Sequence, residues 1–166
     1  MTLAVQEIDV SINGKRYLEL VESRMLLSDF LREICGQTGT HVGCEHGVCG
    51  ACTIMLDDSA VRSCLIFAVQ ADGREIQTVE GLAKDGELTP LQKNFQENHG
   101  LQCGFCTSGI LMAATDFMEK NPEADSQEIK EMLSGHLCRC TGYDGIVKAV
   151  EQTMEENRKS AKGLNA

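Results

Sequence analysis

Short runs within the first eighty residues alternate hydrophobic and polar residues with the period of two that is typical of β-strands. Residues 5–21 contain two alternating runs separated by Asn13-Gly14, a dipeptide that favours a hairpin turn. Apolar residues at helical spacing predict a helix from Ser23 to Glu33. Strands are expected again at Cys52–Leu56, Ala60–Phe67 and Glu75–Val79. Several short strands with one helix across them indicate a β-grasp sheet that ends near residue 80.

From residue 81 the apolar spacing changes to that of helices. Thr89 before Pro90 is a typical helix start, and Asn121-Pro122 is a typical stop. Helices are expected at Leu91–Asn98, from Thr107 or Ser108 to Asn121, from Asp125 or Ser126 to Gly135, and from Ile146 to Asn157. The polar end from Arg158 to Ala166 is expected to fray or to reach toward a partner. Four helices in about eighty residues predict a compact four-helix bundle.

This change of pattern predicts an α+β chain with two domains, residues 1–80 and residues 81–166. The candidate linker from Gly81 to Glu87 is short, so the two domains are expected to pack together. Domains of this size bury small cores and often depend on metals or disulfides.

Eight of the nine cysteines fall into two sets. The first has the C-x4-C-x2-C spacing of plant-type 2Fe-2S ferredoxins, followed by a distant fourth cysteine. Its members are Cys44, Cys49, Cys52 and Cys64. Glycines flank or separate the first three of these cysteines, which allows the chain to bend around a cluster. The second set is a C-x2-C and a C-x-C, namely Cys103, Cys106, Cys138 and Cys140.

Two features of the second set also favour binding of a cluster. Cysteines two apart point in nearly opposed directions on a helix, so Cys138 and Cys140 are expected to lie in an irregular loop. Cys106 directly precedes an expected helix, whose N-terminus favours an anionic cluster.

Cys35 lies outside both sets and is expected to be a small buried hydrophobe. His41, His99 and His136 lack metal-ligand spacing and are expected to be structural or on the surface.

Other uses of the thiols fit less well. A disulfide framework requires an oxidising compartment and usually an even cysteine count, whereas the first twenty residues show no secretory h-region. A reducing cytoplasm is therefore expected. Zinc ribbons usually pair two C-x2-C knuckles, which the first set does not. The net charge of −10 without a basic cluster argues against nucleic acid, and no apolar run is long enough to span a membrane.

Three segments carry a family resemblance: GTHVGCEHGVCGACT at 39–53, QCGFCT at 102–107 and LCRCTGY at 137–143. In order and separation they resemble the small iron-sulfur subunit of the xanthine dehydrogenase family of molybdenum hydroxylases. The resemblance implies a plant-ferredoxin-like domain followed by a helical domain, each with one 2Fe-2S cluster. One departure is Ser108, which stands where many members have proline.

The resemblance also implies partners and a direction for the electrons. They would pass from a molybdopterin centre in a large subunit, through the cluster of the helical domain and then the ferredoxin-like cluster, to FAD in a medium subunit. Cys140 would be both a cluster ligand and the residue whose sulfur approaches the pterin amino group, and Gln102 is a candidate for touching the same cofactor. No residue of this chain is expected to be catalytic. A dimer of heterotrimers is expected.

The substrate pocket would lie in another subunit. Residues 41–52 most resemble members that hydroxylate aromatic N-heterocycles, with aldehydes, purines and carbon monoxide as the alternatives. A free ferredoxin that shuttles between enzymes and a zinc-stabilised interaction module are the two rival functions, and the first predicts a monomer with a hydrophilic helical domain.

Overall fold

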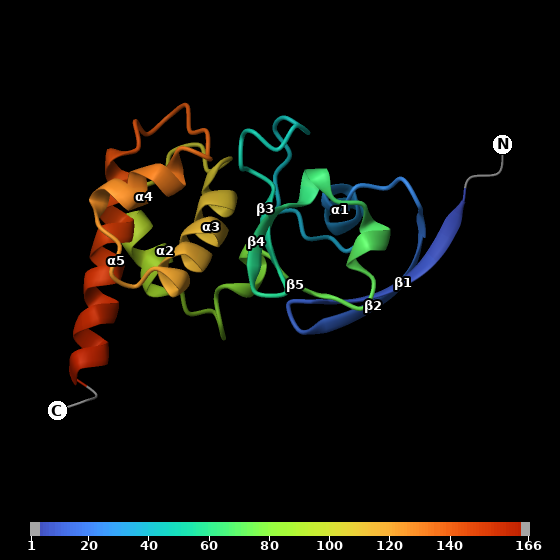
Figure 1. Cartoon of the computed structure of the whole chain (residues 1–166), viewed down its shortest axis with the longest axis horizontal. Helices are drawn as coiled ribbons and strands as arrows, with labels where there is room; N and C mark the ends of the chain where they lie inside the picture. The colour runs from blue at the N-terminus through green and yellow to red at the C-terminus, as the bar shows by residue number, and fades with distance from the viewer. Residues whose placement is uncertain (1–3, 164–166) are drawn as a thin grey trace.

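The computed structural model describes residues 4–163, which form an elongated molecule with a sheet at one end and helices at the other (Figure 1). Five strands form one sheet in the order β2-β1-β5-β3-β4. The β1–β5 pair is parallel and the other pairs are antiparallel. The strands are β1 (Val5–Ile12), β2 (Lys15–Glu22), β3 (Thr53–Leu56), β4 (Ser59–Arg62) and β5 (Glu75–Gln77). Helices follow the sheet, which confirms the α+β class.

The predicted hairpin is confirmed. β1 and β2 pair from Val5 opposite Glu22 to Ile12 opposite Lys15. Asn13 and Gly14 form the turn with φ angles of 52° and 77°, a left-handed conformation that glycine and asparagine tolerate best. The inward residues of β1 pack on the helical turns that cross the sheet, in a core that includes Ile8, Val10, Ile12, Phe30 and Leu31.

The helix expected from Ser23 to Glu33 is wrong in its first turn. Ser23 and Arg24 form a turn and Leu26 is extended; the chain then forms α1 (Leu27–Asp29), which continues as the π-helical turn η1 (Phe30–Ile34). The backbone of this segment instead bonds to a distant part of the chain. The Leu27 N–H donates to Ile66 O, and the Ala68 N–H donates to Met25 O.

The strands expected at Ala60–Phe67 and Glu75–Val79 are shorter than predicted. β4 ends at Arg62, and the 3₁₀ turn η2 (Ser63–Leu65) follows. Ser63 causes the bend, because its N–H and its hydroxyl both donate to Cys52 O, at 3.2 and 2.8 Å. Two further 3₁₀ turns flank β5, namely η3 (Ala68–Ala71) and η4 (Val79–Gly81).

Four helices surround a second core; the first three begin at the predicted signals, and the last begins at Asp144, ahead of the expected Ile146. They are α2 (Pro90–Glu97), α3 (Thr107–Lys120), α4 (Ser126–Leu133) and α5 (Asp144–Gly163). Capping boxes begin two of them, with Thr89 and Gln92 at α2 and Asp125 and Glu128 at α4.

The expectation that residues after Asn157 fray is wrong for the described part of the chain, because α5 continues to Gly163. Arg158 holds this last part against the α3–α4 connection. Its guanidinium donates to Pro122 O at 2.8 Å and to Ala124 O at 2.9 Å. Residues 164–166 lie outside the described residues.

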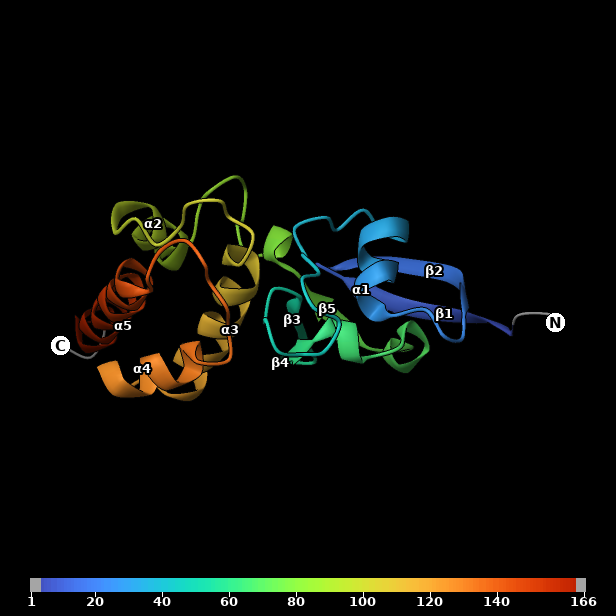
Figure 2. The same ribbon diagram turned by 90° about the horizontal axis from the view of Figure 1, so that it is seen from above.

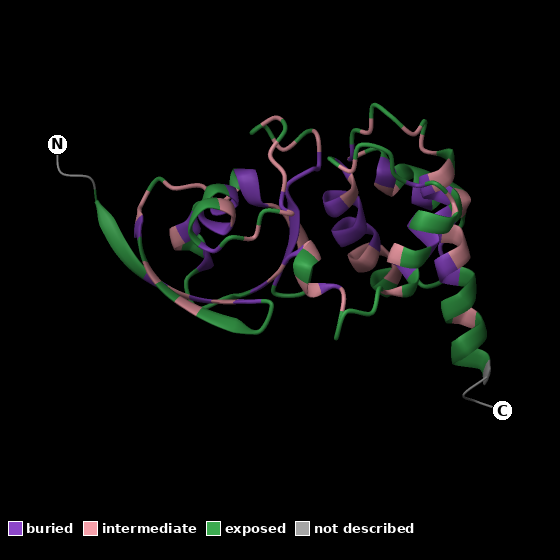
Figure 3. Cartoon of the chain, turned by 180° about the vertical axis from the view of Figure 1, so that it is seen from behind, coloured by how far each residue is buried: buried purple, intermediate pink, exposed green. Residues whose placement is uncertain are grey.

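The two halves pack together through β3 and α3, as the short linker predicts (Figure 2). All four residues of β3 are buried, whereas much of the outer β1–β2 hairpin is exposed (Figure 3). Met55 belongs to the helical core, while its neighbours Ile54 and Leu56 belong to the core of the sheet. Strand alternation therefore gives β3 one side chain row for each core.

Gly109 allows the close approach of α3 to the loop before β3. A Cβ atom at this position would lie 2.1 Å from Gly50 O and 3.0 Å from Ala51 Cα. The helix backbone therefore lies directly against the loop that contains Cys49 and Cys52.

Candidate iron-sulfur sites

The first cysteine set lies on the loop before β3 and on η2. Cys52 and Cys64 are buried, and Cys44 and Cys49 are half-buried. The backbone N–H groups of His46 and Cys49 both point at Cys44 Sγ, each at 3.4 Å. Left-handed backbone at Glu45, Gly47 and Gly50 produces this tight wrapping. The loop therefore turns around a sulfur atom, as a cluster-binding loop must.

These amides set the acidity of the thiol that they surround. Hydrogen bonds from the Cys49 and His46 N–H groups lower the pKa of Cys44 to about 6. Burial has the opposite effect on the other side of the site, where it raises the pKa of Cys64 to about 11. Amide donors that stabilise a thiolate also stabilise a cluster sulfur.

The second set lies on two loops of the helical half. Cys106 is the N-cap residue of α3, and the Cys103 thiol lies in the turn before it. Cys138 and Cys140 lie in the irregular segment before α5, as the C-x-C spacing predicts. The sulfur atoms of Cys140 and Cys103 are 3.5 Å apart. These two residues are exposed, while Cys106 is buried.

Tyr143 orders the segment that carries Cys138. The Cys138 N–H donates to Tyr143 Oη at 2.8 Å, and that hydroxyl donates to His136 O at 2.9 Å. Burial raises the pKa of Cys106 to about 12. Gln102 Nε2 donates to Cys140 O at 3.1 Å, so the structure brings the two predicted pterin contacts together on an exposed surface.

The thiols of each set interact in pairs. Within the part of the chain that is described, no three His, Cys, Asp or Glu side chains are arranged around a single metal position. The interacting pairs are Cys44 with Cys49, Cys52 with Cys64, Cys103 with Cys140, and Cys106 with Cys138. A cluster with two irons and four cysteine ligands needs two thiolates on each iron. The donor set and its pairing therefore fit one 2Fe-2S cluster at each site.

The two sites meet across the seam between the domains, at the top of the molecule in Figure 1. The Leu137 N–H, next to Cys138, donates to Cys49 O at 2.9 Å. The Phe105 ring stacks on His41 with centroids 4.8 Å apart, and a Cβ atom at Gly43 would lie 3.2 Å from that ring. One backbone hydrogen bond therefore connects a ligand residue of one set to the neighbour of a ligand in the other.

Sequence reasoning did not predict the residues of this seam. His41 Nδ1 lies 3.0 Å from Phe105 O and 3.4 Å from Ser108 Oγ. His136 is buried, and burial with the nearby Arg62 lowers its pKa to about 4. Both agree with a structural role. Their partners are more than sixty residues away in the chain, so no local pattern indicates them.

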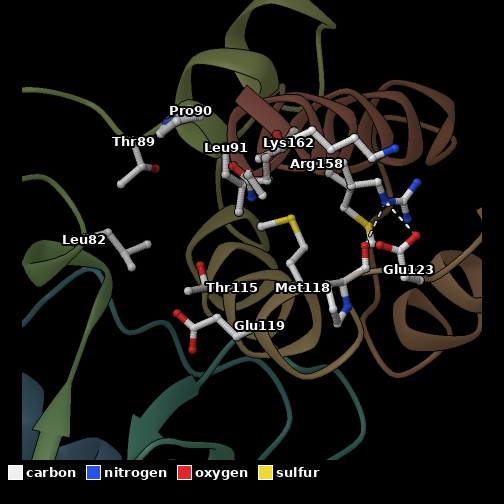
Figure 4. A pocket seen from close by; sticks show the side chains of 15 residues that line it. Leu82, Thr89, Pro90, Leu91, Thr115, Met118, Glu119, Glu123, Arg158 and Lys162 are labelled. Carbon is white, nitrogen blue, oxygen red and sulfur yellow. Dashed lines mark hydrogen bonds and ion pairs between the residues drawn. The ribbon is translucent and has the colours of Figure 1, made fainter. Parts of the chain in front are cut away.

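An apolar groove of about 590 Å³ lies between α2, α3 and α5, away from both cysteine sets (Figure 4). Leu82, Leu91, Met118 and Met154 line it, and an ion pair between Arg158 and Glu123 lies at its edge. None of the described residues that line it is a cysteine, so the groove is separate from the redox sites.

Comparison with known proteins identifies both halves. A 2Fe-2S iron-sulfur cluster binding domain matches residues 10–83, and a 2Fe-2S binding domain matches residues 78–151. The chain is 58% identical over 144 residues to the nicotine 6-hydroxylase small subunit of Paenarthrobacter nicotinovorans, covering 87% of each protein. It is 54% identical to the caffeine dehydrogenase subunit gamma of Pseudomonas sp. strain CBB1, covering 87% of this chain and 88% of that one.

A solved structure gives the same result. Quinoline 2-oxidoreductase from Pseudomonas putida 86 contains a chain that superposes with a TM-score of 0.89 at 48% identity, over 93% of this chain and 97% of that one. This chain is a small iron-sulfur subunit of the xanthine dehydrogenase family of molybdenum hydroxylases. As in that family, it is an electron-transfer subunit of an oxidoreductase with two 2Fe-2S clusters, and its sheet half is a ferredoxin-like domain. None of its described helices has the length and apolar character needed to cross a membrane.

Proposed function

We propose that this subunit carries electrons between two partner subunits through clusters held by its two cysteine sets. The ferredoxin-like domain, residues 1–80, holds one cluster through Cys44, Cys49, Cys52 and Cys64. The helical domain, residues 81–166, is a four-helix bundle and holds the other through Cys103, Cys106, Cys138 and Cys140. The observation that carries the proposal is the meeting of the two sets at the hydrogen bond from Leu137 N–H to Cys49 O.

Each cluster, when bound, accepts and releases one electron at a time. The chain supplies the connection between them. From Cys49 Sγ the path follows the Cys49 backbone to its carbonyl, crosses the hydrogen bond to Leu137 and continues along the backbone to Cys138 Sγ. The path crosses between the domains through a single hydrogen bond, which favours transfer within this one subunit.

The exposed surface at Cys140 is the proposed entry point. Cys140 and Gln102 are exposed and bonded to one another, so a pterin amino group of a large subunit could approach both. FAD in a medium subunit is the proposed acceptor beyond the ferredoxin-like cluster. A dimer of such heterotrimers, located in the cytoplasm, is the proposed assembly.

Hydrophobic side chains near both sites favour a subunit over a free ferredoxin. Leu137 and Phe105 are 59% and 47% exposed at the second set, and Val48 and Leu65 are 63% and 60% exposed at the first. A protein that worked alone would expose this apolar surface to water, whereas partner subunits would cover it.

The proposed substrate of the complex is an aromatic N-heterocycle. The relatives named above act on nicotine, caffeine and quinoline according to their names, and each contains such a ring. The test is turnover by the purified complex with an artificial electron acceptor. Quinoline, nicotine or caffeine should be oxidised faster than benzaldehyde or carbon monoxide, and a preference for an aldehyde or for carbon monoxide would contradict the substrate assignment.

The relay itself is tested by metal analysis and EPR of the chain co-produced with its genomic neighbours. We expect about four irons and four acid-labile sulfides per chain and two distinct rhombic signals after dithionite reduction. Bound zinc without an EPR signal would refute the cluster assignment. Iron in a chain that purifies alone as a stable monomer would support the free ferredoxin instead.

A further inference from the structure

The seam between the domains contains one arginine that contacts both of them. Arg62 is the last residue of β4 and is half-buried. Its Nη1 donates to Thr53 Oγ1 at 2.5 Å, and its Nη2 donates to Gly135 O at 2.8 Å. The planar guanidinium makes both bonds at once, which a lysine ammonium on its flexible stem reproduces poorly. A single side chain thus connects the sheet to the loop that precedes Cys138.

The partners of Arg62 adjoin ligand residues of both sets. Thr53 directly follows Cys52, and its hydroxyl donates to Gly50 O at 2.6 Å, between Cys49 and Cys52. Gly135 begins the turn that leads through Leu137 to Cys138. The two bonds of Arg62 therefore hold the same two loops that the Leu137 to Cys49 hydrogen bond connects.

The charge of Arg62 has no carboxylate partner among the described residues. None of the ion pairs among the described residues includes it. A half-buried cation normally has a nearby negative charge. Each 2Fe-2S cluster with four thiolates would supply one, because four thiolates and two sulfides outweigh two ferric ions.

From these contacts we propose that Arg62 is a positioning residue for electron transfer between the two clusters. Its bidentate contact holds the two cluster loops at a fixed separation, and its charge favours the reduced clusters. This inference rests on the proposed function, since it requires both clusters to be present.

The test compares three variants in the complex purified with its partner subunits. Arg62→Met removes the charge and both donors, Arg62→Lys keeps the charge, and Arg74→Met is the control. Arg74 is also an arginine of the sheet domain, but it is exposed and pairs with Asp57 at 2.6 Å. The measurements are the spin–spin splitting between the two reduced clusters in EPR, their reduction potentials, and hydrogen exchange of residues 135–138.

In Arg62→Met we expect a weaker splitting, lower potentials for both clusters, and exchange about tenfold faster, which is the effect of losing one charge-assisted hydrogen bond. Arg62→Lys should keep the potentials near the wild-type values while weakening the splitting. Arg74→Met should match the wild type in all three.

Wild-type splitting and exchange in a fully loaded Arg62→Met complex would overturn the inference. If that variant does not assemble, the same result in Arg62→Lys would overturn it. Wild-type complex that lacks iron or the two signals would instead refute the proposed function, so the two failures are distinguishable.

Discussion

Replacement of Gly109 by alanine is expected to distort the ferredoxin-like cluster site, although Gly109 lies on α3 of the helical domain. A Cβ atom at this position would lie 2.1 Å from Gly50 O and 3.0 Å from both Cα and the carbonyl carbon of Ala51. To restore an ordinary contact of about 3.5 Å, α3 or the loop must move by over ~1 Å. The colliding atoms are backbone, so no side chain rotation can relieve the contact.

The expected magnitude is the difference of two effects. Inserting a methyl group into a packed region costs roughly 1–3 kcal/mol. Removing a glycine from a helix interior returns about 1 kcal/mol. Net destabilisation should therefore be no more than about 2 kcal/mol. The local effect should be larger than this number suggests, because the displaced loop lies between two ligands of the first set and carries the Cys49 carbonyl.

The assay is urea unfolding together with EPR of the reduced complex. We expect a lower midpoint and a changed signal from the ferredoxin-like cluster. Gly145→Ala is the matched control, because it is also a helix residue whose Cβ would strike backbone, 2.4 Å from Asn98 O, but on the helical side of the molecule. It should lower the midpoint and leave the ferredoxin-like signal unchanged. If Gly109→Ala were as stable as the wild type and its EPR signals were unaltered, the inference that the α3 backbone lies directly against this loop would be contradicted.

Three further predictions follow from the same structure. Cys138→Ser should remove the cluster of the helical domain and leave the other, so that iron and sulfide fall to about half; loss of both EPR signals at once would contradict two separate sites. Cys35 should resist iodoacetamide at pH 8, because burial raises its pKa to about 12 and keeps the thiol protonated. The contribution of buried, protonated Cys35 to the free energy of unfolding is fully present below the ordinary thiol pKa, and it is lost as the pH rises toward 12. Rapid labelling of Cys35 in folded protein, measured by mass spectrometry, would contradict its burial. Thr89→Ala should cost about 1 kcal/mol in urea unfolding because it removes the N-cap of α2, whereas Thr89→Ser should retain most of the stability.

Local signals in the sequence determined the elements whose hydrogen bonds are also local. Asn13-Gly14 specified the hairpin because its left-handed backbone matches the twist of two paired strands. Thr89 and Asp125 specified helix starts because each side chain satisfies N–H groups within three residues. The cysteine spacings identified two sets and the irregular loop of the second, since short spacings limit how a chain can bring thiols together.

Tertiary contacts decided the rest. Met25 and Leu26 belong to the helical apolar spacing, yet this segment is not helical because its backbone bonds to residues 66–68. β4 ends early because Ser63 bonds to Cys52 O, and α5 continues because Arg158 reaches the α3–α4 connection. The relation between the two cysteine sets depends on bonds from Leu137 to Cys49 and from Arg62 to Gly135, which span more than seventy residues. Such contacts form only when both domains have folded, so a pattern read along the chain determines the contents of each site and the packed structure determines how the two sites face each other.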